Sequence, residues 1–365
     1  MKRVGTLVAA IACTALVQIG AGPAALAEGV LPPEVRDSVS GEVVFYDTSG
    51  GANSRARNAT IEKDFTEETG VTVRNDYNSD TTKFFAAMEN EAPIPWSMVE
   101  FPTKGDYLRA RDAGYLQKLD PKVIDFSKLE DGAYDEYGVD VQRYGIVLTY
   151  NTEKFSGSSA PTSIRDIYDL EKFPGKRCLF KYPQFGAVLE SALLADGVDR
   201  SALYPLDLDR AFAKLDTIKS DILWWGNGDE AIRLLSSGEC SIGVAWSGRV
   251  YSAVKEDNAP LAMVWNDSLY AQAVYAIPNG APNAAAAQVL IAYFISDTEA
   301  QKALVREIPY TTAIVALDSA SYGDEMVPWI VAGENAEVAI LEDANYYKEH
   351  LPEVVDRFNR WVATN

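Results

Sequence analysis

The chain has 365 residues, with 33 Lys or Arg against 53 Asp or Glu, and therefore carries a formal net charge of −20 at pH 7. Such a length suits two lobes of about 100 to 200 residues each. The acidity argues against nucleic acids and anionic membranes as partners, because their binding draws on clustered Lys and Arg. His350 is the one histidine, which removes most histidine-based chemistry. We therefore predict no metal, no cofactor and no enzymatic activity.

The N-terminus has the pattern of an export signal. Two basic residues follow Met1, an apolar run covers residues 4–19, and Ala25-Leu26-Ala27 precedes an acidic residue. This order predicts a signal peptide over residues 1–27 with cleavage after Ala27, and hence a periplasmic protein that we expect to be monomeric. Two alternatives are a membrane anchor, for which the run is short of the ~20 residues that a bilayer needs, and a lipid on Cys13.

Two cysteines, Cys178 and Cys240, remain after cleavage. An even pair in an exported protein suggests a disulfide, and two buried free thiols are the alternative. Neither cysteine belongs to a Cys-x-x-Cys motif, so the sequence gives no indication of metal binding or redox catalysis.

The first third of the chain alternates between short apolar strands and amphipathic helices. The predicted segments are a strand at 43–46, a glycine-rich loop at 47–52, a helix ending at Gly70, a strand at 71–73, a helix at 83–91, a strand at 97–101 and a helix capped by Thr103. This β-α-β-α-β order is typical of an α/β layer with a mainly parallel sheet.

The same alternation restarts after residue 176 and predicts a second lobe. Its segments are strands at 177–181, 222–225 and 241–246, and helices at 186–195, 207–219, 230–236 and from Ser247. Extended apolar segments at 144–150 and 271–277 flank this region, and we interpret them as two connections between the lobes. Helices at 284–295, with Asn283 as N-cap, and at 299–307 then return to the first lobe. The predicted division is 28–145 plus 271–312 for lobe 1 and 146–270 plus 313–365 for lobe 2.

Six short motifs resemble a known family when they are taken together. They are FTEETGVTV at 65–73, GYLQKLD at 114–120, FPGK at 173–176, SGE at 237–239, AWSG at 245–248 and AIP at 276–278. Over nearly the whole chain after the signal peptide they resemble solute-binding proteins of ABC importers, and in particular the spermidine/putrescine-binding branch.

That resemblance implies a type II-like, two-lobed clamp. Each lobe would be a mixed, mainly parallel sheet flanked by helices, with two hinge crossings and a ligand cleft between the lobes. The partners would be a small solute, a membrane permease and its ATPase. In the resembling fold the strands that carry Cys178 and Cys240 are neighbours, which would bring the two thiols within reach of each other.

The match to the family is uneven at the ligand pocket. Trp246 and Thr103 agree with an aromatic and a hydroxyl of the family pattern. Thr48 and Gly105 replace aromatic residues. The family's acidic partners for ligand ammonium groups are replaced by Ala273, by Pro183-Gln184 and by Ala187. These departures argue against a polyamine.

Loops that follow strands are the positions at which α/β proteins bind ligands. Small residues at 48–51 expose backbone N–H groups that suit an anion, whereas Asp47 and Glu100 suit an ammonium group. Any one aromatic is more often buried in a core than in contact with a ligand. The candidate ligand-binding residues are Asp47, Thr48, Ser49, Gly50, Glu100, Thr103, Gln184, Trp225, Trp246, Arg249 and Tyr310.

Together these residues predict capture of a small, amine-bearing, polyamine-like solute. The alternatives are an amino-acid-like zwitterion and an anionic or phosphorylated solute, because the arginines and the glycine-rich loop favour an acidic group. A secreted enzyme is a remote alternative. Gly226-Asn227-Gly228 lacks the third glycine of a dinucleotide loop.

Overall fold

The computed structural model describes Met1 and residues 29–364. The predicted signal peptide, its cleavage site after Ala27 and Cys13 therefore lie outside the described residues. Among the helices of the described part, none combines the length and the apolar character that a membrane crossing requires.

Nine strands form one continuous sheet in the described residues. Their bounds are β1 Glu42–Asp47, β2 Thr72–Tyr77, β3 Met98–Phe101, β4 Gly138–Asn151, β5 Lys176–Phe180, β6 Ile222–Trp225, β7 Cys240–Trp246, β8 Leu261–Ala276 and β9 Ile340–Leu341. Along the sheet the order is β2-β1-β3-β8-β4-β7-β5-β6, and β9 pairs with β8.

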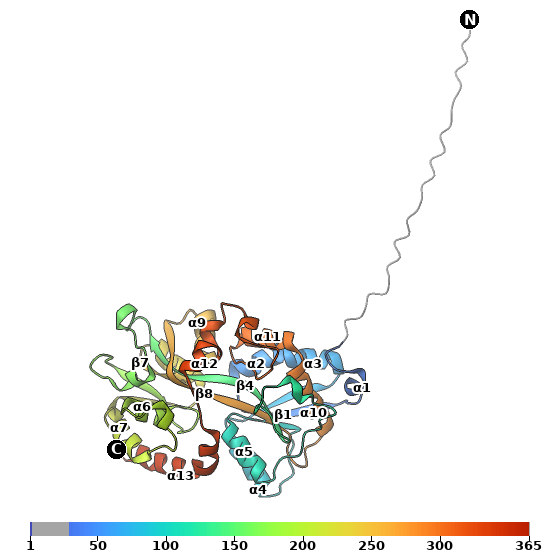
Figure 1. The fold of residues 1–365 in the computed structure, drawn as a ribbon, viewed down its shortest axis with the longest axis horizontal. Helices are drawn as coiled ribbons and strands as arrows, with labels where there is room; N and C mark the ends of the chain where they lie inside the picture. Colours follow the sequence, from blue (N-terminus) through green and yellow to red (C-terminus); the bar gives the residue numbers. More distant parts are fainter. Residues whose placement is uncertain (2–28, 365) are drawn as a thin grey trace.

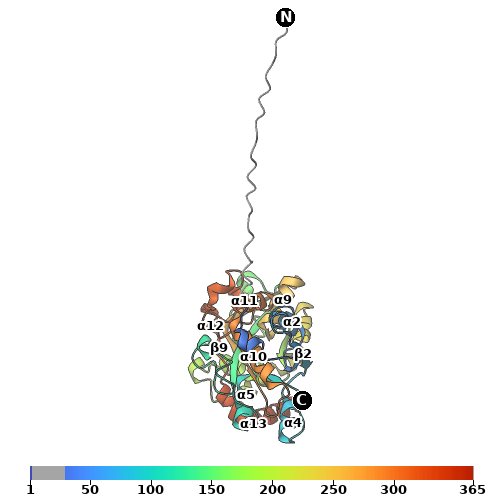
Figure 2. The ribbon, with the colours of Figure 1, turned by 90° about the vertical axis from the view of Figure 1, so that its right-hand side faces the viewer.

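Helices lie on both faces of this sheet, with α2, α9 and α11 on one side and α4, α5 and α13 on the other (Figures 1 and 2). Their bounds are α1 Pro33–Arg36, α2 Gly51–Ala59, α3 Ile61–Thr69, α4 Thr82–Glu89, α5 Lys104–Asp112, α6 Val188–Ala195, α7 Leu208–Asp216, α8 Gly228–Ser236, α9 Ser247–Glu256, α10 Ala284–Ser296, α11 Thr298–Glu307, α12 Glu334–Val338 and α13 Ala344–Ala363. The predicted two-lobed α/β architecture is confirmed.

Each lobe has a parallel group of strands. β1 pairs in parallel with β2 and β3, and β5 pairs in parallel with β6 and β7. The antiparallel pair β4 and β8 joins the two groups, since β3 pairs with the end of β8 and β7 pairs with the end of β4. The two segments predicted as lobe connections therefore lie in two adjacent long strands that run through both lobes.

The pairing of β4 and β8 supports a bend near the predicted lobe boundary. Gly145 pairs with Tyr270 there, and the register shifts between Ile146 and Leu148. A Cβ atom on Gly145 would lie 2.5 Å from the Trp265 ring, so the glycine permits the close approach of that side chain. The numerical lobe boundaries stay a prediction.

Local signals explain how several helices begin and end. The Thr103 hydroxyl accepts a hydrogen bond from Asp106 N at 3.2 Å, which confirms the predicted cap of α5. Gly70 ends α3 in the left-handed region with φ 72°. Asn283 is different, because its side chain does not cap α10 but donates to the carbonyls of Ser40 and Glu42. Asn283 therefore occupies the predicted N-cap position but does not make the side-chain hydrogen bond of a cap.

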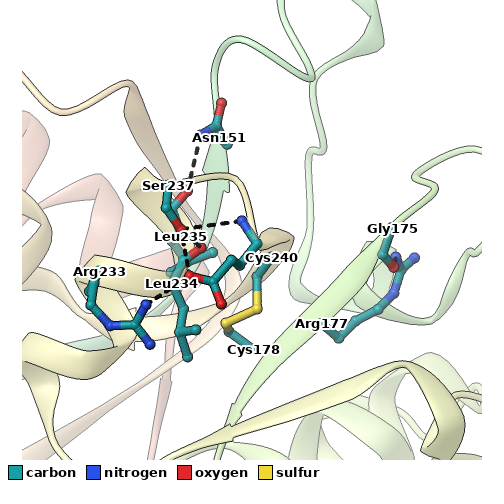
Figure 3. Close-up of a disulfide and its surroundings, with 10 residues drawn as sticks. Asn151, Gly175, Arg177, Cys178, Arg233, Leu234, Leu235, Ser237 and Cys240 are labelled. Carbon is teal, nitrogen blue, oxygen red and sulfur yellow. Dashed lines mark hydrogen bonds and ion pairs between the residues drawn. A yellow bond between two sulfur atoms is a disulfide. The ribbon is translucent and has the colours of Figure 1, made fainter.

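The predicted disulfide is present between Cys178 of β5 and Cys240 of β7, with Cα atoms 5.7 Å apart (Figure 3). Both cysteines are fully buried, and their strands are parallel neighbours. Near the disulfide, the side-chain amide of Asn151 in β4 donates to the carbonyl of Leu235 in α8 at 3.0 Å.

Replacing both cysteines (Cys178→Ala with Cys240→Ala) is expected to lower the free energy of unfolding by about 4 kcal/mol, because the bond closes a long loop in the unfolded chain. The cysteines are 62 residues apart in sequence. Urea titration of the double variant against the parent measures the loss. As a control, thiol titration of the unfolded, unreduced protein starting at Glu28 should detect no free thiol, and two reactive thiols would contradict the bond.

Candidate ligand-binding site

A small pocket of about 70 Å³ lies where the two lobes meet, beside β4 and β8. Its lining residues come from both lobes and are Thr48, Ser49, Asn53, Ser79, Pro102, Gln142, Tyr144, Phe185, Trp246, Arg249, Ala273 and Tyr310. At about 10–15 Å³ for each water-sized group, this space holds roughly five to seven such groups. The pocket therefore matches a small solute of a few heavy atoms.

Aromatic rings form the walls of the pocket. Trp246 stacks on Phe185 at a centroid distance of 6.1 Å, and its indole N–H donates to the Phe185 carbonyl at 3.2 Å. Tyr144 and Tyr310 face each other at 5.7 Å, and the Tyr144 hydroxyl donates to the Pro102 carbonyl at 2.8 Å. Such rings present apolar surface together with π faces that attract cations.

Arg249 is the one charged residue among the side chains that line this pocket. Arg249 lies in the first turn of α9 and is 8% exposed. One of its terminal nitrogens donates to the carbonyls of Ser49 and Gly50 at 3.2 and 3.1 Å, which joins the two lobes. Its Nε is buried without a hydrogen-bond partner in the described residues. Arg249 Nε is therefore a donor that no described residue uses, whereas Nη1 of the same guanidinium lies 3.7 Å from Asp229 Oδ1.

Asp47 and Glu100 were expected to face a ligand ammonium group, but the structure places both away from the pocket. Both are buried around Arg57, whose guanidinium lies 2.9 Å from Asp47 Oδ1 and 3.4 Å from Glu100 Oε1. Glu62 is the third carboxylate on Arg57, at 3.2 Å. Neither Asp47 nor Glu100 lines the pocket, because the buried cation holds both carboxyl groups.

The two carboxyl groups respond differently to this environment. Burial raises the pKa of Glu100 above its ordinary value, despite the opposing charge of Arg57. Burial also acts on Asp47, but Arg57 and the Ser54 hydroxyl together hold the pKa of Asp47 below its ordinary value. Asp47 is therefore ionised beside Arg57 at neutral pH.

Three backbone donors of the glycine-rich loop bind carboxylates of the protein itself. Thr48 N and Ser49 N donate to Glu100 Oε2 at 2.9 and 3.0 Å, and Gly50 N donates to Asp47 Oδ1 at 3.2 Å. These three N–H groups are therefore not available to a ligand. Thr48 and Ser49 still line the pocket, as predicted.

The remaining predicted residues lie behind the pocket or beside it. Thr103 and Gln184 are buried and meet across the cleft, where Gln184 Nε2 donates to Thr103 Oγ1 at 2.9 Å. Trp225 is fully buried and packs edge-on against Trp246 at 5.2 Å. It supports the pocket wall and does not form it.

Seven lining residues were not among the predicted ligand-binding residues, and they are Asn53, Ser79, Pro102, Gln142, Tyr144, Phe185 and Ala273. Asn53 and Gln142 exchange side-chain hydrogen bonds of 2.9 and 3.2 Å, which joins the first turn of α2 to β4. Phe185 reaches the pocket from a loop in which its φ is 42°, the left-handed region. A buried position in β4 marks Gln142 as unusual, but nothing local marks Asn53 or Phe185.

Comparisons with known proteins identify the class. Residues 60–325 match the family of bacterial extracellular solute-binding proteins, and the chain belongs to that family. A gamma-aminobutyric acid-binding protein of Pseudomonas aeruginosa is 35% identical over 327 residues, which cover 86% of this chain and 89% of the relative.

Solved structures agree with this assignment. A GABA receptor structure has a TM-score of 0.77 with 34% identity, over 89% of this chain and 98% of the other. An ABC transporter substrate-binding protein from Bradyrhizobium japonicum has a TM-score of 0.80 with 30% identity, over 88% of this chain and 99% of the other. The protein is therefore a non-enzymatic solute-binding component of an ABC importer. These relatives do not place it in the spermidine/putrescine branch.

Proposed function

We propose that the protein binds a small ω-amino acid such as GABA in the interlobe pocket and delivers it to an ABC permease. The observation that carries this proposal is the charge of the lining, which has Arg249 and no carboxylate. The relatives that bind GABA favour the same conclusion.

The acidic end of the solute belongs at Arg249. A guanidinium forms strong, directional hydrogen bonds with a carboxylate, and the low exposure of Arg249 strengthens the attraction. Its unpartnered Nε supplies a donor that the protein does not use.

The amino end then lies among the aromatic rings. Trp246, Phe185, Tyr144 and Tyr310 attract an ammonium group through their π faces, and the hydroxyl of Thr48 accepts a hydrogen bond. A diamine of the same length would bring a second cation to Arg249 without any lining carboxylate to balance it. The charge pattern therefore disfavours putrescine and spermidine.

A thermal-shift panel of four-carbon compounds separates the charge requirements. GABA carries both charged ends, butyrate only the acid, butylamine only the amine, and putrescine two amines. We expect GABA to give the largest shift, since a ligand at 100 times its dissociation constant stabilises by about 2.7 kcal/mol. A larger shift with putrescine would contradict the proposal, and equal shifts with butyrate and GABA would assign the site to simple carboxylates.

Transport is expected to use the bend in β4 and β8. We propose that the lobes, divided at 145 and 270, open about these strands to release the solute to the permease and its ATPase. The mature protein would act as a periplasmic monomer after cleavage at Ala27.

A further inference from the structure

Glu342 lies directly behind the Phe185 wall of the pocket. It follows β9, precedes α13 and is 5% exposed. Its Oε2 accepts a hydrogen bond from Phe185 N at 2.9 Å, and its own N–H donates to the Tyr270 carbonyl. Because Phe185 has the left-handed φ of 42°, which non-glycine residues rarely adopt, this hydrogen bond helps to hold the backbone in that conformation.

The neighbouring residue Gln184 links the same carboxyl group to the opposite lobe. Its Nε2 donates to Thr103 Oγ1 at the start of α5, and its side chain adjoins Glu342. Gln184 Oε1 is buried and has no hydrogen-bond partner within the described residues. A neutral carboxyl group at Glu342 has one O–H to donate to this oxygen and one oxygen to accept from Phe185 N. With the Gln184 amide in this orientation, both needs are met only by the protonated form.

The surroundings favour that form. The strongest charged neighbours of Glu342 are also acidic, Glu190 from α6 and Asp106 from α5. Phenol groups complete the environment, and they are Tyr144 of β4, Tyr182, Tyr204 and Tyr347 of α13. Burial first, and then the charge of Glu190, raise the pKa of Glu342 to about 8, against the lowering effect of its hydrogen bonds with Phe185 and Gln184, so the group is neutral at pH 7.

We propose that Glu342 is a positioning residue for solute binding, whose neutral carboxyl group fixes Phe185 against the pocket and orients Gln184 to close onto Thr103. This inference rests on the proposed function, because it assumes that the pocket holds the solute. Glu342 itself does not line the pocket and acts through its two neighbours.

The direction in which GABA affinity changes with pH follows from the loss of the Glu342 carboxyl proton. Above pH 8 the carboxyl group ionises, loses its donor to Gln184 and becomes an uncompensated buried charge. The affinity for GABA is therefore expected to fall as pH rises, by up to about tenfold per pH unit for one linked proton. If the Gln184 amide is instead turned so that its N–H₂ group donates to an ionised Glu342, the affinity will not fall.

Three variants test the inference. Glu342→Gln keeps one acceptor and one donor at every pH, Glu342→Ala removes both, and Glu337→Gln is a matched change at an exposed acid nearby. The first measurement is the hydrogen exchange of the Phe185 amide without ligand. The second is the dissociation constant for GABA between pH 6 and 9, a range in which an alkyl amine with a pKa near about 10.4 stays charged.

We expect Phe185 protection in the parent, Glu342→Gln and Glu337→Gln proteins, and at least tenfold faster exchange in Glu342→Ala. Affinity should fall above pH 8 in the parent and Glu337→Gln proteins but stay constant in Glu342→Gln. Unchanged Phe185 exchange in Glu342→Ala, or equal pH profiles for the parent and Glu342→Gln, would overturn the inference. If Glu342→Ala does not fold, the pH profiles decide.

The two proposals fail in different ways. If GABA does not bind the parent at any pH while Phe185 exchange changes as expected, the proposed solute is wrong and the positioning role stands. If GABA binds with no pH dependence between pH 6 and 9, the solute stands and the role of Glu342 is wrong.

Discussion

An Arg57→Met variant is expected to lose about 3–5 kcal/mol of the free energy of unfolding, because it leaves buried carboxylates without their cation. Arg57 is 0% exposed and forms ion pairs with Asp47, Glu62 and Glu100. Urea denaturation followed by circular dichroism at pH 7 measures the loss. The methionine keeps much of the apolar stem, so the missing charge dominates the effect.

Two controls separate charge from packing in the Arg57 experiment. Arg55→Met changes an exposed arginine of the same helix and should alter stability by less than about 0.5 kcal/mol. Adding Glu100→Gln to Arg57→Met should recover part of the loss, and the deficit should shrink toward pH 4 as the carboxyl groups become protonated. An unchanged urea midpoint in Arg57→Met would show that the cluster does not stabilise the fold.

An Arg249→Ala variant is expected to bind GABA at least about 30-fold more weakly than the parent, since removing one partner of a buried, hydrogen-bonded charge pair costs about 2 kcal/mol or more. The affinity of Arg249→Lys for GABA should lie between those of the parent and Arg249→Ala, because an ammonium keeps the charge but not the planar set of donors. Calorimetric titration at pH 7 measures all three dissociation constants.

Arg233→Ala provides the matched control for Arg249, since it removes an exposed arginine from α8 of the same lobe. Its affinity for GABA should equal that of the parent. If Arg249→Ala also binds normally, the solute carboxylate lies elsewhere and the orientation proposed for the pocket is wrong.

Most elements of the fold could be predicted from local patterns. Short apolar strands, the cap at Thr103 and the stop at Gly70 depend on neighbours in sequence, which is why they were found. Only half of β4 was predicted, because the burial of its first residues depends on β8, far along the chain. The long helix α13 was not predicted, and it contains Pro352, a residue that usually marks a helix end.

The site was harder to predict because its charges interact over long distances. Trp246 ends β7 and Arg249 lies in the first turn of the helix that follows, so their place at the cleft could be inferred. The sequence does not show that Arg57 turns inward and binds Asp47 and Glu100, since an arginine on a helix is usually exposed. The backbone N–H of Phe185 donates to Glu342, from near the C-terminus, and no local sequence pattern indicates that contact.

The path of β8 through both lobes also constrains the order in which a growing chain folds. β3 gains its second neighbour only when Ala276 emerges to pair with Val99, and the covering helices α10 and α11 come later still. The first lobe therefore exposes apolar surface until nearly the whole polypeptide has been made. The second lobe's parallel group, β5 to β7, is contiguous in sequence and has its own covalent link. We expect this strand group to form before the sheet of the first lobe is complete, and α13, whose Phe358 and Trp361 pack on Trp224, to cover it last.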